Sequence, residues 1–472
     1  MSRVLVLMPG SGHVRNLLRS GGLDATLTAH DCVFAVPAGF DAPADLAEIK
    51  RRGEIIGTYA SDPERERLHG LLFDALMWRH RRRSRTFLYR WQRTAGVNRI
   101  VRTRGPWVRI KSSARWTLWV MRKWTPVRTV LLGSAVIHPI ARRLLERRIG
   151  HDPDLRTLVA RAAPDLVILP TNAYEAVGMD LVRLTRGTSV RTLFLVDNWD
   201  NLSSKTLLWA RPDHLAVWGE QSAEHAVEIQ GMAASDVSVV GTARFGDYYA
   251  ARATPPASPY PFPYVLFVGA ALANDELAVL RQLDDLLEAR ADDDGLRVVY
   301  RPHPWQQPRA VDAEFEPTAF RHVVLDRQFI EEAPARSGDQ RDFQPDLGWY
   351  PALLVNARLV MGPLTTMLLE GSVCRRRVLA LAHDDGVHFT TPSQAYRWYR
   401  HFEGVETIEG FTLCHDLTEL PDLFLPLAAD TTPLDAQRVD RSVDRFVHHD
   451  GRPFADRLLG TVDRVLAQPS PR

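Results

Sequence analysis

The stretch RLVMGPLTTMLLEGSVCRRRVLAL (358–381) decides the fold class of this chain. Residues 358–362 form an apolar run before a proline, residues 365–373 have helical character, and residues 377–381 form a second apolar run. A strand, a helix and a strand in this order predict a βαβ unit with two parallel strands. Continuous apolar runs also indicate strands that are covered on both faces of their sheet.

The same alternation extends through most of the 472 residues and predicts an α/β protein with Rossmann-like domains. Apolar runs predict strands at 3–8, 31–37, 165–171, 190–197, 214–220, 237–241, 264–270, 296–304 (with its following loop), 322–326, 358–362 and 377–381. Helices are expected at 155–163, 174–185, 222–232, 274–290, 349–357, 365–373 and 453–468.

A proline-rich segment, TPPASPYPFP (254–263), divides the chain. Its prolines fix the backbone and remove hydrogen-bond donors, so we expect a semi-rigid linker. The predicted domains are an N-terminal Rossmann-like domain (1–253) and a C-terminal one (264–450). Residues 451–472 are expected to form a helix that packs back on the N-terminal domain.

Composition excludes several classes of protein. Three cysteines without a C-x-x-C pair cannot build a disulfide scaffold and argue against a structural zinc site. The start, MSRVLVLMPG, is typical of a first strand and not of a signal peptide. Because the chain lacks a run of about 18 apolar residues, we expect no membrane-spanning helix and a cytoplasmic location.

Charge is distributed very unevenly. Residues 79–148 hold 20 Arg and Lys against one acid, Glu146, although the whole chain has a net charge of only +2. Six of the twelve tryptophans lie within 78–148. We therefore expect a mainly helical, basic and Trp-rich insertion at about 63–150, with a task of its own.

Three interpretations of this insertion remain open. Tryptophan favours the headgroup region of a membrane and arginine favours anionic lipids, so residues 78–148 are predicted to bind an anionic membrane surface. The protein would then be peripheral on the inner face of the cell membrane. Alternatively, the tryptophans belong to the core and the arginines are solvated, or the segment binds nucleic acid. We expect no nucleic-acid partner, because no RNA-binding module is present in the sequence.

Two segments of the C-terminal domain suggest a phosphate site. His303 stands between two prolines after a predicted strand, next to Arg301. Thr365 and Thr366 stand between a strand and a helix start, where backbone N–H groups and the helix dipole favour an anion. Glu370 lies one turn further on the same helix face, suited to accept hydrogen bonds from ribose hydroxyls. The alternative is a threonine N-cap on an ordinary helix.

The first predicted strand of the N-terminal domain ends in a glycine-rich turn. Gly10 and Gly12 let the backbone approach an anion, and His13 follows them. The full G-x-G-x-x-G spacing is absent, so an ordinary βα turn is an equal alternative.

Dense polar chemistry follows the strand at 190–197. The segment VDNWDNLSSK (196–205) places Asp197 and Asp200 near Lys205, in a chain with only four lysines and 55 arginines. A carboxylate near a lysine in a closed site can act as a general base. The alternative is a turn whose side chains bond local amides.

The segments VVYRPHP (298–304) and ALLVNARLVMGPLTTMLLEGSVCRRRVLAL (352–381) resemble the HP and Ser/Thr motifs of bacterial capsule-type glycosyltransferases. That group has the GT-B fold and includes polysialyltransferases, capsule Kdo transferases and CDP-glycerol glycerophosphotransferases. The stretch VSVVGTARFGDYY (237–249) also resembles the end of a GT-B N-terminal domain. The resemblance implies two Rossmann-like domains facing across a cleft, with the nucleotide donor on the second.

The resemblance implies a metal-independent glycosyltransferase acting on a surface-polysaccharide or lipid-linked acceptor, as in capsule or lipopolysaccharide synthesis. Its donor would be a CMP-, CDP-, UDP- or GDP-linked sugar, bound as substrate, with no tightly bound cofactor. His303, Thr365 and Thr366 would bind the donor phosphates and Glu370 would lie near the ribose, with Arg301 and Lys205 assisting.

This chain departs from the family pattern in having Thr-Thr and in lacking the acidic base motif of the sialyltransferases. Asp200, Asp197 and His13 therefore remain alternative bases. A CDP-alditol polyol-phosphate transferase, a nucleotide-sugar epimerase and a non-enzymatic membrane adaptor are the alternative functions.

Overall fold

The computed structural model describes residues 1–60, 62–95, 124–205, 207–272, 274–290, 294–303, 315–332, 348–386, 388 and 390–468. The chain divides into two compact units. The first unit comprises Met1–Gly246 and Asp444–Arg472, and the second comprises Asp247–Val443, which includes the proline-rich segment.

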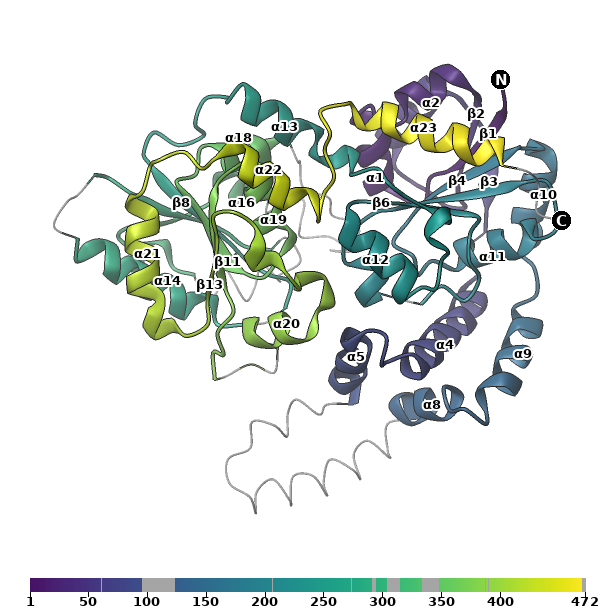
Figure 1. The fold of residues 1–472 in the computed structure, drawn as a ribbon, viewed down its shortest axis with the longest axis horizontal. Coiled ribbons are helices and arrows are strands. Elements are labelled where there is room, and N and C mark those ends of the chain that lie inside the picture. The colour runs from purple at the N-terminus through teal and green to yellow at the C-terminus, as the bar shows by residue number, and fades with distance from the viewer. Residues whose placement is uncertain are drawn as a thin grey trace, which may run out of the picture. The chain divides into compact units, whose positions relative to one another are not determined.

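A parallel seven-stranded sheet forms the centre of the first unit, in the order β3-β2-β1-β4-β5-β6-β7 (Figure 1). Every residue of β4 and β5 is buried, which explains why these strands are continuous apolar runs. The strands are β1 (Arg3–Leu7), β2 (Asp31–Pro37), β3 (Glu54–Tyr59), β4 (Leu166–Thr171), β5 (Arg191–Val196), β6 (His214–Val217) and β7 (Val237–Val239).

Helices connect these strands, and most are short. They are α1 (Ser11–His13), α2 (Asp24–Ala29), α3 (Pro43–Arg52), α4 (Pro63–Arg79), α5 (Arg85–Ala95), α8 (Trp124–Leu132), α9 (His138–Ile149), α10 (Pro153–Ala162), α11 (Ala176–Thr185), α12 (Glu220–Glu228) and α23 (Phe454–Ala467). Single π-helical segments follow α1 (Val14–Arg19) and β5 (Asn201–Lys205).

The described part of the basic insertion is mainly helical, as the sequence predicts. It contains α4, α5, α8 and α9, which Figure 1 shows at the end of the first unit away from α2 and α23. Asp62 caps α4 by accepting hydrogen bonds from the N–H groups of Glu64 and Arg65. Residues 96–123, with Trp107, Trp116 and Trp119, lie outside the described residues.

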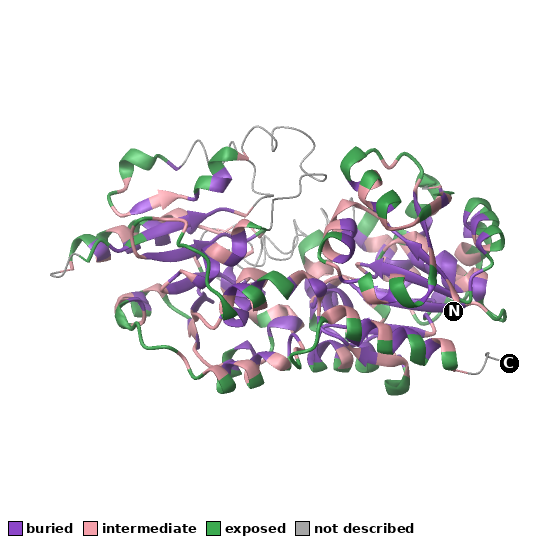
Figure 2. Cartoon of the chain, turned by 90° about the horizontal axis from the view of Figure 1, so that it is seen from above, coloured by how far each residue is buried: buried purple, intermediate pink, exposed green. Residues whose placement is uncertain are grey.

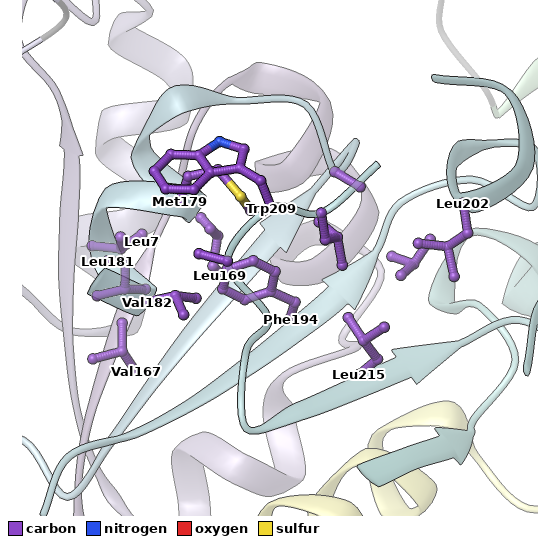
Figure 3. Close-up of a cluster of buried hydrophobic side chains, with 14 of the residues drawn as sticks. Leu7, Val167, Leu169, Met179, Leu181, Val182, Phe194, Leu202, Trp209 and Leu215 are labelled. Carbon is purple, nitrogen blue, oxygen red and sulfur yellow. The ribbon is translucent and has the colours of Figure 1, made fainter. Parts of the chain in front are cut away.

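Side chains alternate between the two faces of the first sheet and build a core on each. Leu5 and Leu7 of β1 belong to one cluster, whereas Val4 and Val6 belong to the other. Figure 3 shows the first cluster, in which Leu169 and Phe194 lie near Met179 and Trp209. The second cluster contains three residues of α23, spaced as one helix face: Leu458, Val462 and Val465.

A parallel six-stranded sheet forms the second unit, in the order β10-β9-β8-β11-β12-β13. Figure 2 shows that the strands of both units are largely buried, whereas the surrounding helices have exposed faces. The strands are β8 (Tyr264–Val268), β9 (Arg297–Arg301), β10 (Val323–Leu325), β11 (Leu359–Pro363), β12 (Arg377–Leu381) and β13 (Phe411–Cys414). The helices are α13 (Gly246–Ala253), α14 (Glu276–Glu288), α16 (Arg327–Glu331), α18 (Trp349–Val355), α19 (Thr366–Val373), α20 (Pro392–Trp398), α21 (Leu420–Ala429) and α22 (Ala436–Asp444).

Two strands were not predicted from the sequence, and both lie at a sheet edge. β3 ends the first sheet and β13 ends the second. Edge strands are only half covered, so their sequences mix apolar and polar residues: EIIGTY in β3 and FTLC in β13. Neither has the continuous apolar run that identifies the central strands.

Candidate active site

The carboxyl edge of the second sheet brings the predicted phosphate motifs to neighbouring positions. His303 lies two residues after β9, and Thr365 lies two residues after β11. Because β8 lies between β9 and β11, the ends of these two strands are about 10 Å apart, twice the usual strand spacing. In parallel α/β sheets, this edge is where ligands bind.

Two glycines allow the three strand ends to pack closely. A Cβ on Gly269 would lie 2.8 Å from the backbone nitrogen of His303. A Cβ on Gly362 would lie 2.1 Å from the carbonyl oxygen of Val268, and the φ of Gly362 is +148°. Only glycine fits either position without movement of the backbone. The loops that carry His303 and Thr365 are therefore fixed against the end of β8.

Helix α19 begins at Thr366 with Thr365 as its N-cap residue. The side chain of Thr365 makes no capping hydrogen bond, although its backbone is extended as in a normal N-cap. Both threonines are half-buried. The simple alternative, in which Thr365 serves to cap the helix, is thus not what the geometry shows.

His303 is half-buried, and its surroundings favour the neutral ring. Burial lowers the pKa of His303 from 6.5 to about 4. Near neutral pH the imidazole is therefore uncharged, with one N–H to donate and one nitrogen to accept. An arriving phosphate would favour the protonated ring and so raise this pKa.

Arg301 and Glu370 are both engaged in buried contacts. The guanidinium of Arg301 is 1% exposed, forms an ion pair with Asp326 and donates to the hydroxyl of Tyr350 at 2.9 Å. Glu370 is fully buried, and its Oε2 accepts a 2.9 Å hydrogen bond from the hydroxyl of Tyr248. Either side chain would have to give up these contacts before it could bind a ligand directly.

The carboxyl edge of the first sheet gathers the second set of predicted residues. Gly10 has an extended backbone and precedes α1, and Gly12 and His13 lie within α1. His13 is 8% exposed, and neither of its ring nitrogens has a hydrogen-bond partner among the described residues. The imidazole is therefore available for a proton transfer or for a ligand.

The loop after β5 contacts the π-helical segment that follows α1. Asn16 donates a hydrogen bond of 3.2 Å from its Nδ2 to Oδ1 of Asp197. Asp200 lies three residues on, where its Oδ2 contacts Lys205 Nζ at 3.3 Å and accepts a 3.2 Å hydrogen bond from Ser204 Oγ. Lys205 and Asp200 thus form an ion pair within one loop.

Three further polar residues at this edge were missed by sequence reasoning. Asn172 and Glu175 follow β4, which lies between β1 and β5. Glu175 accepts hydrogen bonds from the Thr171 hydroxyl at 2.6 Å and from Asn172, whose Oδ1 accepts from Asn201 at 3.3 Å. Asn16 is the third. The polar run TNAYE (171–175) directly after an apolar strand was the signal that could have found two of them.

The described residues contain no cluster of three or more His, Cys, Asp or Glu side chains that could hold a metal ion. Each candidate site instead offers hydroxyls, amides, an imidazole and a helix start. This donor set suits a phosphate or a sugar.

Comparisons with known proteins show the fold. No protein-family model matches the sequence, and no curated protein does. A Listeria monocytogenes protein assigned as a UDP-N-acetylglucosamine 2-epimerase is 12% identical, with a TM-score of 0.51 over 99% of this chain and 98% of that one. The S. aureus MnaA–UDP co-structure is 10% identical, with a TM-score of 0.51 over the whole of both chains. A glycosyltransferase from Rickettsia africae is 10% identical, with a TM-score of 0.47 over 99% of each chain.

The chain has the GT-B fold. Its two Rossmann-like units, each with a parallel sheet, match the fold expected from the sequence.

Proposed function

We propose that this protein is a metal-independent glycosyltransferase that moves a sugar from a nucleotide-sugar donor to a surface-polysaccharide or lipid-linked glycan acceptor. The observation that carries the proposal is the position of His303 and Thr365, after the strands on either side of β8. Capsule and lipopolysaccharide precursors are the acceptor classes we favour.

The donor phosphates bind at the carboxyl edge of the second sheet. The start of α19 supplies N–H groups and the positive end of the helix dipole. Thr365 and Thr366 add hydroxyls, and His303 donates from its ring. As the bond from the sugar to the phosphate breaks, negative charge grows on the departing nucleotide, and fixed donors stabilise it most at that moment.

The acceptor hydroxyl is activated by a residue of the first unit. Asp200, Asp197 or His13 takes the hydroxyl proton, the acceptor oxygen bonds to the anomeric carbon, and the nucleotide leaves with the bonding electron pair. The orphaned ring nitrogens of His13 and the carboxylates after β5 support a role in proton transfer.

A nucleotide-sugar epimerase is the second candidate, because the Listeria protein assigned as a UDP-N-acetylglucosamine 2-epimerase shares this fold. An epimerase converts a nucleotide sugar without an acceptor, whereas a transferase needs one. A CDP-alditol polyol-phosphate transferase would instead accept CDP-glycerol. Incubation with UDP-, GDP- and CMP-sugars and with CDP-glycerol, each with and without added glycan acceptors, separates the three activities.

Nucleotide binding itself is tested by thermal unfolding with CMP, CDP, UDP and GDP. A ligand at about 100 times its Kd stabilises the folded state by about 2.7 kcal/mol. We expect one base to give the largest rise in Tm, and His303→Ala to abolish it. His322→Ala is the matched control. His322 directly precedes β10, so it lies at the amino ends of the strands, away from the carboxyl edge that carries His303. An equal rise in wild type and His303→Ala would contradict the phosphate site.

A further inference from the structure

The helices α8 and α9 expose an unusual share of the apolar surface of the first unit. Ten large apolar side chains are exposed in the described part of the chain, and six lie between Trp124 and Leu144. Those six are Trp124 (62%), Leu131 (42%), Val136 (82%), Ile137 (40%), Ile140 (62%) and Leu144 (59%). Scattered exposed apolar residues are normal, whereas a concentration of this kind marks an interaction surface.

Polar residues occupy much of the protein-facing side of α9. His138 is 5% exposed, and its Nδ1 lies 3.0 Å from the carbonyl oxygen of Leu132. One turn later, Arg142 donates to the carbonyl oxygen of Trp209 at 3.2 Å. Leu145 of the same face packs against the core cluster, and Ile149 is 2% exposed.

The opposite face of α9 is apolar and basic. Ile137, Ile140 and Leu144 follow an i, i+3, i+7 spacing, so they lie on one side of the helix. The side chains of Arg143 and Arg147 are exposed beside them. A helix that turns a row of apolar side chains toward solvent is unfavourable unless another apolar phase covers that row.

Helix α8, which contacts α9, exposes further apolar side chains. Trp124 and Leu131 are seven residues apart, on one side of the helix, and both are exposed. Residues 124–149 hold five arginines and one glutamate, so the surface is strongly basic as well as apolar. We define the α8–α9 surface as the six exposed apolar residues together with Arg143, Arg147 and Arg148.

We propose that the α8–α9 surface lies on an anionic lipid membrane, with its apolar side chains at the level of the headgroups. A surface with arginines around apolar side chains suits an anionic bilayer. The anionic headgroups attract the arginines, and the boundary between headgroups and acyl chains takes up the apolar side chains. No helix in the described residues is long and apolar enough to cross a bilayer.

Two tryptophans of the insertion do not belong to this surface. Trp78 and Trp91 pack against each other with ring centroids 4.6 Å apart, and Trp91 Nε1 donates to the carbonyl oxygen of Pro126. They hold α4, α5 and α8 together. Trp124 is the one exposed aromatic residue among the six, and base stacking by RNA-binding proteins needs several aromatic faces. The surface therefore fits lipid better than nucleic acid.

Co-sedimentation of the full-length protein with vesicles tests the proposal. We expect binding to phosphatidylcholine vesicles that contain phosphatidylglycerol, weaker binding to phosphatidylcholine alone, and loss of binding at high salt. Ile140→Ser/Leu144→Ser should reduce the partition coefficient at least about tenfold, because two apolar anchors are removed. Arg143→Glu/Arg147→Glu should do the same through charge.

The matched control is Val227→Ser/Ile330→Ser, which removes two exposed apolar residues elsewhere and should bind as wild type. Unchanged binding of Ile140→Ser/Leu144→Ser overturns the proposal, as does equal binding to neutral vesicles. Binding of wild type to single-stranded RNA in a gel shift, together with no binding to vesicles, overturns the membrane proposal in favour of nucleic acid. The nucleotide-induced rise in Tm should be equal in all variants, so this proposal and the proposed function fail separately.

Discussion

The hydroxyl of Tyr248 donates a 2.9 Å hydrogen bond to Oε2 of Glu370, and the two side chains are 2% and 0% exposed. Tyr248 belongs to α13 and Glu370 to α19, the helix that begins at the proposed phosphate site. The carboxylate expected near a ribose is therefore also a buried structural acceptor. It links the start of the second unit to α19, the helix at which we propose that the nucleotide binds.

Tyr248→Phe should destabilise the protein by about 1–3 kcal/mol, because a buried carboxylate loses a hydrogen-bond donor. Chemical denaturation measures this change. Tyr59→Phe is the control: Tyr59 is 4% exposed, and its hydroxyl has no hydrogen-bond partner among the described residues. A loss of stability in Tyr59→Phe as large as in Tyr248→Phe would show that the Tyr248–Glu370 bond is not the cause.

Gly362→Ala should disrupt the carboxyl edge of the second sheet. The added Cβ would lie 2.1 Å from the carbonyl oxygen of Val268, at a φ of +148° that alanine rarely adopts. We expect a loss of more than about 3 kcal/mol of stability or failure to accumulate as soluble protein. Gly10→Ala is the control, because its Cβ would meet no atom within 4 Å. A Gly362→Ala protein as stable as wild type would argue against this close packing.

His303 should make the protein less stable as the pH falls. Its pKa is lowered to about 4 in the folded state from 6.5, so the unfolded chain binds more protons between these values. The stabilisation is complete above pH 6.5 and is lost as the pH falls toward 4. Between pH 7 and pH 5, wild type should lose about 1–2 kcal/mol more than His303→Gln. Parallel stability curves from urea titrations would contradict a neutral His303 in the folded state.

Asp200→Asn should abolish turnover and leave the nucleotide-induced rise in Tm intact, because an amide cannot take the proton from the hydroxyl of the glycan acceptor. Loss of a general base costs about 10²–10⁴ in rate. Asp197→Asn and His13→Gln, measured beside it, identify the base as the variant with the largest fall in kcat. Turnover near the wild-type rate in Asp200→Asn would move the role to one of the other two.

The central strands were predictable because each is an apolar run closed by a turn. β4, for instance, is buried at all six positions and therefore carries its own signature in the sequence. The edge strands β3 and β13 are covered on fewer sides and lack that signature. The motif positions at His303 and Thr365 were also predictable, because each directly follows such a run.

The partners of the candidate residues were not predictable. Asn16 and Asp197 are 181 residues apart, and Tyr248 and Glu370 are 122 apart. Which polar side chains meet at a sheet edge depends on strand order, and strand order is not encoded in the local pattern of either segment. For the same reason, the contacts of Arg301 with Asp326 and Tyr350 could not be predicted from the sequence.

The place of α23 has a consequence for biosynthesis. Leu458, Val462 and Val465 complete a core whose other members begin at Val4, and the second unit is encoded between them. A ribosome therefore releases all of the second unit before the first can close. Until α23 is synthesised, the apolar residues that it covers on the first sheet remain exposed, so truncation of the last helix would uncover a core that begins at Val4.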